Sequence, residues 1–307
     1  MPLESTIREI RLELQAIEQD TTLYEEAGFS RRLEALDTIE VNILERVGGL
    51  LTAHGKAEAL VVLKQRTEMV RSRMEAIDER LFHRLRAGIR SGHYRGAELK
   101  RRLEAYTGRG RGGKDRDDGA YDSLDALLSG ILLAEAAPGE TMEREAEMVP
   151  YQPTPARIIF ELVERAGLQK HDIFYDLGSG LGQVVILVNL LSGATAKGIE
   201  VDPAYCAYAR RCAQDLNLPG VEFINGDARE ADYRDGTVFF LYTPFEGRML
   251  QQVLERLRGE AAQRTIAVYT YGPCTWQVGR QDWLACVGLD DHHTDRLAAF
   301  RSIRGGS

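Results

Sequence analysis

Residues 172–183 read Asp-Ile-Phe-Tyr-Asp-Leu-Gly-Ser-Gly-Leu-Gly-Gln, and this stretch decides the fold. The apolar run 173–175 predicts a buried strand that Asp176 closes, and the run 184–191 predicts a helix. The turn between them contains three glycines, Gly178, Gly180 and Gly182. A glycine-rich turn between a strand and a helix lets a ligand approach the backbone and meet free N–H groups at the helix N-terminus.

The spacing of these glycines separates two classes of ligand. Dinucleotide sites favour Gly-x-Gly-x-x-Gly, with the pyrophosphate on the helix N-terminus. Here the spacing is Gly-x-Gly-x-Gly, and Asp176 stands two residues before the first glycine. A carboxylate at that position would repel a pyrophosphate and attract the ammonium group of an amino-acid-bearing ligand. The ligand that fits is S-adenosylmethionine (SAM).

Two further carboxylates end the next two apolar runs. Glu200 follows Gly182 by 18 residues, close to the position that holds ribose hydroxyls in such folds. Asp227 follows the run 221–226, where it can accept a hydrogen bond from an adenine amino group. Ser179 and Ala228 adjoin these groups and are predicted to line the same site. A lone glycine triplet also suits an ordinary tight turn, but three carboxylates at successive strand ends favour a SAM site.

Residues 150–258 resemble class I SAM-dependent methyltransferases, and within that class the non-SET histone-lysine methyltransferases of the disruptor-of-telomeric-silencing (DOT) type. The resemblance rests on the segment 172–185 and on Tyr151-x-x-Thr154 upstream. It implies that Tyr151 and Thr154 close over the cofactor and the methyl-transfer channel; a solvent-facing linker is the alternative. Gln183 is expected to contact the methionine end of the cofactor or to cap the helix.

The segment Tyr242-Thr243-Pro244-Phe245 stands where the histone enzymes carry Asn-Asn-Phe, so the departure falls where the acceptor would be chosen. We expect Tyr242 and Thr243 to contact the cofactor, and we predict Thr243, Tyr151 and Phe245 as catalytic residues. A Thr243 carbonyl or hydroxyl would orient an amine, and Phe245 would form an apolar wall. An aromatic channel would also lower the pKa of a lysine amine from about 10.4. The alternative is a strand-ending turn with Phe245 in the core.

The pattern along the chain predicts two domains, 1–149 and 150–307. Apolar residues recur at helical spacing in three stretches of the first 81 residues, which predicts an all-α antiparallel bundle, or a coiled-coil dimer through the third helix. Residues 107–119 read as a loop, 121–134 as a helix and 136–148 as a linker. The second domain alternates between strands and helices. The predicted strands are 172–176, 195–200, 221–225, 237–242 and 264–271; the predicted helices are 155–166, 182–192, 203–216 and 247–258.

The fold class that follows is α/β, with a Rossmann-like methyltransferase domain behind the helical bundle. The resemblance implies a seven-stranded sheet closed by a hairpin at 283–287 and 297–303, with an antiparallel edge strand. Neither a membrane span nor a signal segment is evident, and four cysteines without ligand spacing predict reduced thiols and no metal, so a cytoplasmic enzyme is expected.

The distribution of charge along the chain gives a hint about the methyl acceptor. The net charge is −8, but residues 80–116 hold twelve Lys/Arg against three acids. The leading prediction is methylation of a protein, with a lysine amine favoured. A nucleic acid bound through the basic segment, a small molecule, or a catalytically silent SAM-binding scaffold are the alternatives.

Overall fold

The computed structural model describes residues 3–55, 57–107, 121–132, 136–288 and 294–303. The chain divides into two compact units, Met1–Leu85 with Arg101–Gly113, and Arg86–Lys100 with Lys114–Ser307. In this division the residues between 121 and 149 group with the sheet. The predicted loop 107–119 lies outside the described residues except for Thr107.

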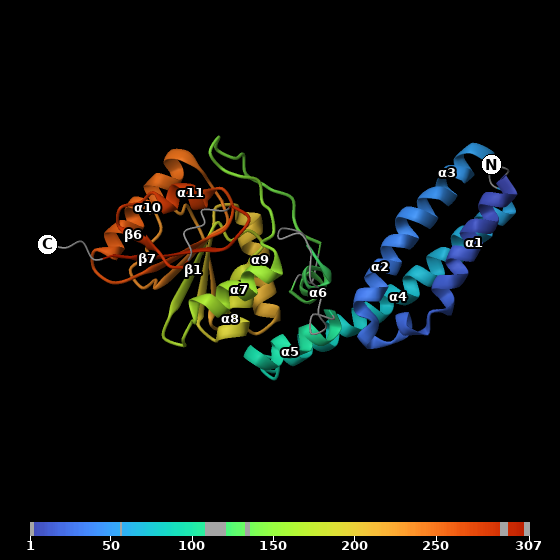
Figure 1. Cartoon of the computed structure of the whole chain (residues 1–307), viewed down its shortest axis with the longest axis horizontal. Helices are drawn as coiled ribbons and strands as arrows, with labels where there is room; N and C mark the ends of the chain where they lie inside the picture. The colour runs from blue at the N-terminus through green and yellow to red at the C-terminus, as the bar shows by residue number, and fades with distance from the viewer. Residues whose placement is uncertain (1–2, 56, 108–120, 133–135, 289–293, 304–307) are drawn as a thin grey trace. The chain divides into compact units, whose positions relative to one another are not determined.

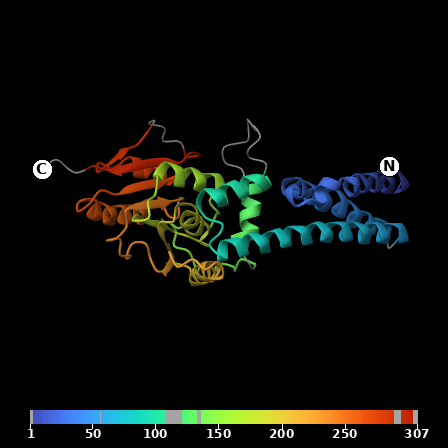
Figure 2. The same cartoon turned by 90° about the horizontal axis from the view of Figure 1, so that it is seen from below.

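The first unit is built from three helical runs. The first run is α1 (Leu3–Gln19). The second joins α2 (Phe29–Asp37), a π-helical turn (Thr38–Leu44) and α3 (Glu45–His54). The third is α4 (Glu58–Arg90), whose last residues belong to the second unit. The runs lie side by side in both views (Figures 1 and 2). Each buries one apolar stripe in a shared core that includes Ile10, Ile39, Ile43 and Met74. The helical spacing of the apolar residues therefore predicted these helices correctly.

The second unit is a seven-stranded sheet with the order β3-β2-β1-β4-β5-β7-β6. Its strands are β1 (Ile173–Leu177), β2 (Thr195–Glu200), β3 (Val221–Asn225), β4 (Val238–Leu241), β5 (Ala267–Thr270), β6 (Leu284–Cys286) and β7 (Ala298–Ser302). Strands β1 to β5 pair in parallel, and β7 pairs antiparallel with both β5 and β6. The expected hairpin closes the sheet: β6 forms the edge and pairs antiparallel with β7, which lies inside the sheet next to β5.

Helices cover both faces of the sheet. Figure 1 shows α7 (Ala156–Ala166), α8 (Gln183–Ser192) and α9 (Pro203–Asp215) on one side, and α10 (Gly247–Ala261) and α11 (Cys274–Gly279) on the other. The α10 side packs an apolar core on Leu177, Phe239 and Val268. Two further helices, α5 (Gly96–Thr107) and α6 (Ser123–Leu132), precede the sheet in sequence. Over the described ranges, no helix is both long enough and apolar enough to cross a lipid bilayer.

Candidate active site

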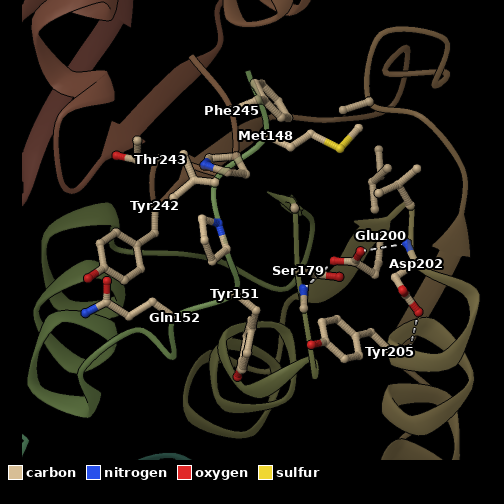
Figure 3. A pocket seen from close by; sticks show the side chains of 18 of the residues that line it. Met148, Tyr151, Gln152, Ser179, Glu200, Asp202, Tyr205, Tyr242, Thr243 and Phe245 are labelled. Atoms are coloured by element: carbon tan, nitrogen blue, oxygen red, sulfur yellow. Dashed lines mark hydrogen bonds between the residues drawn. The ribbon is translucent and has the colours of Figure 1, made fainter. Parts of the chain in front are cut away.

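A pocket of about 360 Å³ lies at the carboxyl ends of β1, β2 and β4. Ligands bind at this edge of doubly wound sheets, because loops there converge without a covering helix. Figure 3 shows Gln152, Tyr242 and Thr243 on one side of the pocket and Ser179, Glu200 and Tyr205 on the other. The lining contains every residue predicted for the site: Tyr151, Thr154, Asp176, Gly178, Ser179, Gly180, Gln183, Glu200, Asp227, Ala228, Tyr242, Thr243 and Phe245.

The glycine turn brings distant segments of the chain into contact. Gly178, Gly180 and Gly182 have φ values of +83°, +52° and +85°, which side chains other than hydrogen rarely tolerate. A Cβ on Gly178 would lie 2.2 Å from Cβ of Pro244, and one on Gly180 would lie 2.2 Å from Cε2 of Tyr151. The turn therefore needs glycine both for its backbone and for the close approach of Pro244 and Tyr151.

Asp176 is a buried carboxylate with no hydrogen-bond partner in the described part of the chain. It is 3% exposed at the end of β1. Burial and the nearby charge of Glu200 raise the pKa of Asp176 well above its ordinary value of 3.8. Among the residues that the structure describes, no hydrogen-bond donor or cation offsets these effects. A cationic group placed beside Asp176 would restore the ionised form.

Glu200 joins the glycine turn to the start of α9. Its Oε2 accepts a hydrogen bond from the N–H of Gly180 at 2.7 Å, and its Oε1 accepts one from the N–H of Asp202 at 2.8 Å. Burial raises the pKa of Glu200, while these N–H groups lower it. Each carboxylate oxygen has a second lone pair, so Glu200 retains the capacity to accept from hydroxyl groups of a ligand.

Asp227 differs from Asp176 because it is paired within the chain. Its two oxygens accept from the Arg229 guanidinium at distances down to 2.6 Å, and Arg229 also contacts Glu145 at 2.6 Å. The Arg229 hydrogen bonds lower the pKa of Asp227. Asp227 still lines the pocket beside Ala228, with a side chain that is 26% exposed.

The segment 140–149, which we call the strap, forms one wall of the pocket instead of a free linker. Asp202 accepts hydrogen bonds from the N–H and Oγ1 of Thr141 at 2.7 and 2.9 Å. Glu147 accepts from the N–H of Met249 at 2.7 Å, at the start of α10. An isolated β-bridge then joins Met148 to Phe245. The strap is thus attached to the sheet at three separate places.

The residues after β4 are engaged within the protein. Thr243 has a φ of +40°, unusual for a β-branched residue and a sign of a constrained site. Its hydroxyl donates to the carbonyl of Tyr271 at 3.2 Å and accepts from the N–H of Cys274 at 3.1 Å. Phe245 is 7% exposed and belongs to the core on the α10 side while lining the pocket.

Comparison with known proteins places this geometry in a family. A family model described as histone methylation protein DOT1 matches residues 148–227. A protein-lysine N-methyltransferase from Saccharolobus islandicus (strain REY15A) is 30% identical over 112 residues, which are 35% of this chain and 69% of that protein. The chain belongs to the class I SAM-dependent methyltransferases. The expected class, fold and DOT-type resemblance are therefore confirmed.

Two RNA-modifying methyltransferases are also similar to this chain. A probable ribosomal RNA small subunit methyltransferase A from Thermococcus onnurineus (strain NA1) is 30% identical over 114 residues, but these cover only 39% of that protein. The crystal structure of an RNA methyltransferase from Salinibacter ruber in complex with S-adenosyl-L-homocysteine is 28% identical, with a TM-score of 0.38 over 51% of this chain and 96% of that one. The two curated relatives thus differ in the acceptor that their names give, protein lysine for one and ribosomal RNA for the other.

Sequence reasoning missed the strap of this methyltransferase. The composition of residues 136–148 is typical of a linker, and the contacts that fix the strap join residues far apart in the chain. Thr141 and its partner Asp202 are separated by 61 positions, and Glu147 and Met249 by 102. A local pattern carries no signal for such pairs, although the acidic Glu145 and Glu147 are the residues that make two of the attachments.

Proposed function

We propose that this methyltransferase transfers a methyl group from SAM to a lysine amine of a protein. The observation that carries the acceptor class is the charge of the pocket. Within the described lining, seven residues are carboxylic acids, namely Glu140, Glu143, Asp176, Glu200, Asp202, Asp227 and Glu246, and one, Arg144, is basic. Such a lining attracts a cationic amine and repels the phosphates of a nucleic acid.

The basic segment gives less support to an RNA acceptor than its sequence suggests. Arg84 pairs with Glu26, and Lys100 pairs with Glu164. Arg86 and Arg90 donate to main-chain carbonyls of Ile131 and Asp215 at 2.7 and 2.6 Å. These cations are thus used in internal contacts. These are four of the twelve cations of the segment, and a further four, Arg109, Arg111, Lys114 and Arg116, lie outside the described residues.

Asp176 and Glu200 support the placement of SAM in the pocket. In this proposal Asp176 holds the ammonium group, which explains a buried carboxylate without an internal partner. Glu200 accepts from the ribose hydroxyls, and Asp227 with Ala228 adjoins the adenine. Ser179, Gly178 and Gly180 form the floor, and Tyr151, Thr154 and Gln183 enclose the methionine end. Bound SAM supplies a methyl group on a sulfonium, whose sulfur keeps the bonding electrons when the acceptor nitrogen attacks.

The chain itself would prepare the acceptor amine. A protonated lysine must release its proton to water before its lone pair can form the new N–C bond. Burial of the amine beside Tyr151 and Phe245 disfavours the charged form and so lowers its pKa. We assign a positioning role to Thr243, because its hydroxyl is engaged with Tyr271 and Cys274 and its backbone sets the direction of the segment. Phe245 would form the wall that aligns donor and acceptor.

We further propose that residues 150–307 carry the catalytic machinery and that the enzyme acts in the cytoplasm. The cysteines support the location, since Cys206, Cys212, Cys274 and Cys286 are all free thiols.

Labelled SAM tests the proposed function. The full chain is incubated with labelled SAM and fractionated cell lysate, and the product is then treated with protease or nuclease. We expect protease to destroy a labelled product that retains its label through nuclease treatment, and Asp176→Asn to form much less of it at the same SAM concentration. A nuclease-sensitive product would establish the RNA alternative, and no turnover in any fraction would favour a silent SAM-binding scaffold.

A further inference from the structure

Tyr242 and Tyr271 line the pocket, and a third tyrosine from a distant part of the sequence, Tyr121, lies near its mouth. Tyr242 follows β4 and Tyr271 follows β5, and their ring centroids are 4.8 Å apart at an interplanar angle of 45°. Tyr121 precedes α6, and its hydroxyl donates to the carbonyl of Pro153 at 2.5 Å. Pro153 lies two residues from Tyr151, whose ring covers the glycine turn. Tyr121 therefore stands beside the segment that closes the pocket.

Tyr121 is held in this place by α6. Asp125 is 8% exposed, and its Oδ1 accepts from the N–H of Ala156 at 2.7 Å, which satisfies a free donor at the start of α7. Its Oδ2 accepts from the N–H of Asp122 at 2.8 Å, next to Tyr121. The apolar face of α6 is buried through Leu124, Leu127 and Leu128, among other residues. A segment that sequence analysis places before the catalytic domain is thus attached to the mouth of the pocket.

The tyrosines expose neutral aromatic surface at this point. Tyr121 is 47% exposed, and burial of its phenol together with the neighbouring Tyr271 raises the pKa of Tyr121. Burial first, then Tyr121 and Tyr271, raise the pKa of Tyr242 to about 12. Gln152 lies beside Tyr242 (Figure 3) and also adjoins the Tyr121 hydroxyl, which places Tyr121 near the pair of Tyr242 and Tyr271. The raised pKa values keep Tyr121 and Tyr242 protonated at neutral pH, and the electron-rich ring faces are what the tyrosines offer to a ligand.

We propose that Tyr121, Tyr242 and Tyr271 form an aromatic cleft that binds the alkylammonium group of the acceptor lysine, or of a lysine that already carries methyl groups. The inference rests on the proposed function and names the part of the site that selects its acceptor. A cation is attracted to the face of an aromatic ring within about 6 Å. A flexible alkyl chain also fits between tilted rings, and the acidic lining behind the tyrosines adds a second attraction for the same charge.

Two isosteric probes separate charge from shape. One is a short peptide with a single trimethyllysine, and the other carries the neutral analogue in which carbon replaces the ammonium nitrogen. Binding of each to the full chain, saturated with S-adenosylhomocysteine, is measured by calorimetry. We expect the cationic peptide to bind about fivefold or more tightly, as a cation–π contact of about 1 kcal/mol requires. Equal binding, or no binding of either peptide, would overturn the inference.

Variants locate the effect at the rim. Tyr121→Ala should lower the affinity for the cationic peptide about fivefold and reduce the difference between the probes, with unchanged SAM affinity. Tyr121→Phe removes the hydrogen bond to Pro153 but keeps the ring, so the preference for the cation should survive. Tyr24→Ala, which removes a ring that packs on Arg73 in the other unit, is the matched control and should change neither value.

Steady-state kinetics with a labelled protein acceptor from lysate keep the two proposals apart. Tyr121→Ala should raise KM for the acceptor at least fivefold while kcat for bound acceptor changes less. An unchanged KM with intact lysine methylation would overturn the role of Tyr121 and leave the proposed function standing. Label in RNA alone would remove the proposed function, and the inference with it.

Discussion

The two units of this protein each bury an aspartate, and the two aspartates differ in one respect. Asp78 in the helical unit is 7% exposed, and Asp176 at the end of β1 is 3% exposed. Burial raises the pKa of both carboxyls. Asp78 is paired with the fully buried Arg32, whose Nε and Nη2 lie 2.8 and 2.7 Å from its Oδ1. Asp176 has the negative charge of Glu200 nearby instead of a cation.

The difference separates a structural group from a binding group. Arg32 also donates to the carbonyl of Leu23 at 3.0 Å, so the pair ties α2 and α4 to the turn between α1 and α2. That ion pair is complete without a ligand. A carboxylate that is equally buried but lacks a counter-charge destabilises the free protein, and either protonation or a bound cation offsets the cost. Burial alone therefore does not identify a functional aspartate, whereas burial without an internal partner does.

The largest expected effect is on the structural aspartate. Asp78→Asn should destabilise the protein by about 3–5 kcal/mol, because it leaves the charge of Arg32 buried without a counter-charge. Denaturant unfolding of the helical unit measures the loss, and SAM affinity should remain that of the parent. A change in stability below about 1 kcal/mol would show that Asp78 and Asp176 do not differ in the way described.

The second prediction concerns the binding aspartate. Asp176→Asn should weaken SAM binding by about 10- to 150-fold, or about 1.5–3 kcal/mol, because a charge-assisted hydrogen bond to the ammonium group is lost. Calorimetry gives the affinity. The SAM-free variant should be at least as stable as the parent, since the uncompensated charge is gone. Parent-like affinity in this isosteric variant would remove Asp176 from the site.

The third prediction follows from the sign of the same pKa shift. A carboxyl whose pKa is higher in the folded than in the unfolded state binds its proton more tightly when folded. Its contribution to stability is present below the unfolded pKa, near 3.8, and is lost as pH rises through the folded pKa. Unfolding of SAM-free parent and Asp176→Asn at several pH values should therefore show the parent losing stability relative to the variant as pH increases. Parallel curves would contradict the raised pKa.

The smallest expected effect concerns Thr243, which lines the pocket. Like Asp78, its side chain already has its polar partners within the protein. Thr243→Ala should lower turnover about tenfold with little change in SAM affinity, because loss of the bonds to Tyr271 and Cys274 lets the segment after β4 move. Thr243→Ser keeps the hydroxyl and should retain most of the activity. Equal rates for parent and Thr243→Ala would show that Thr243 has no positioning role.

The sequence predicted those features that a local pattern encodes. Alternation of apolar runs with helical stripes predicted strands β1 to β5 and helices α7 to α10, and the glycine spacing marked the turn before Gln183. The hairpin of β6 and β7 came from the family resemblance, and α11 was not predicted. Strand ends were less accurate: β5 spans Ala267–Thr270 instead of the predicted 264–271. Arg264 instead donates to the carbonyls of Tyr233 and Gly236, which keeps its segment out of the ladder. The strap and Tyr121 escaped prediction because their partners are distant in sequence.

The hydrogen bond between Asp125 and the N–H of Ala156 joins α6 to the first helix of the sheet unit, which limits where the chain can be truncated. A fragment that begins at residue 150 would start α7 without its cap and would lack the entire strap. The smallest portable piece of this enzyme therefore begins before Tyr121, well upstream of the first residue that matches the family model. If the N-terminal helices were replaced by another domain, we expect that α6 and the strap would have to be retained together with the sheet.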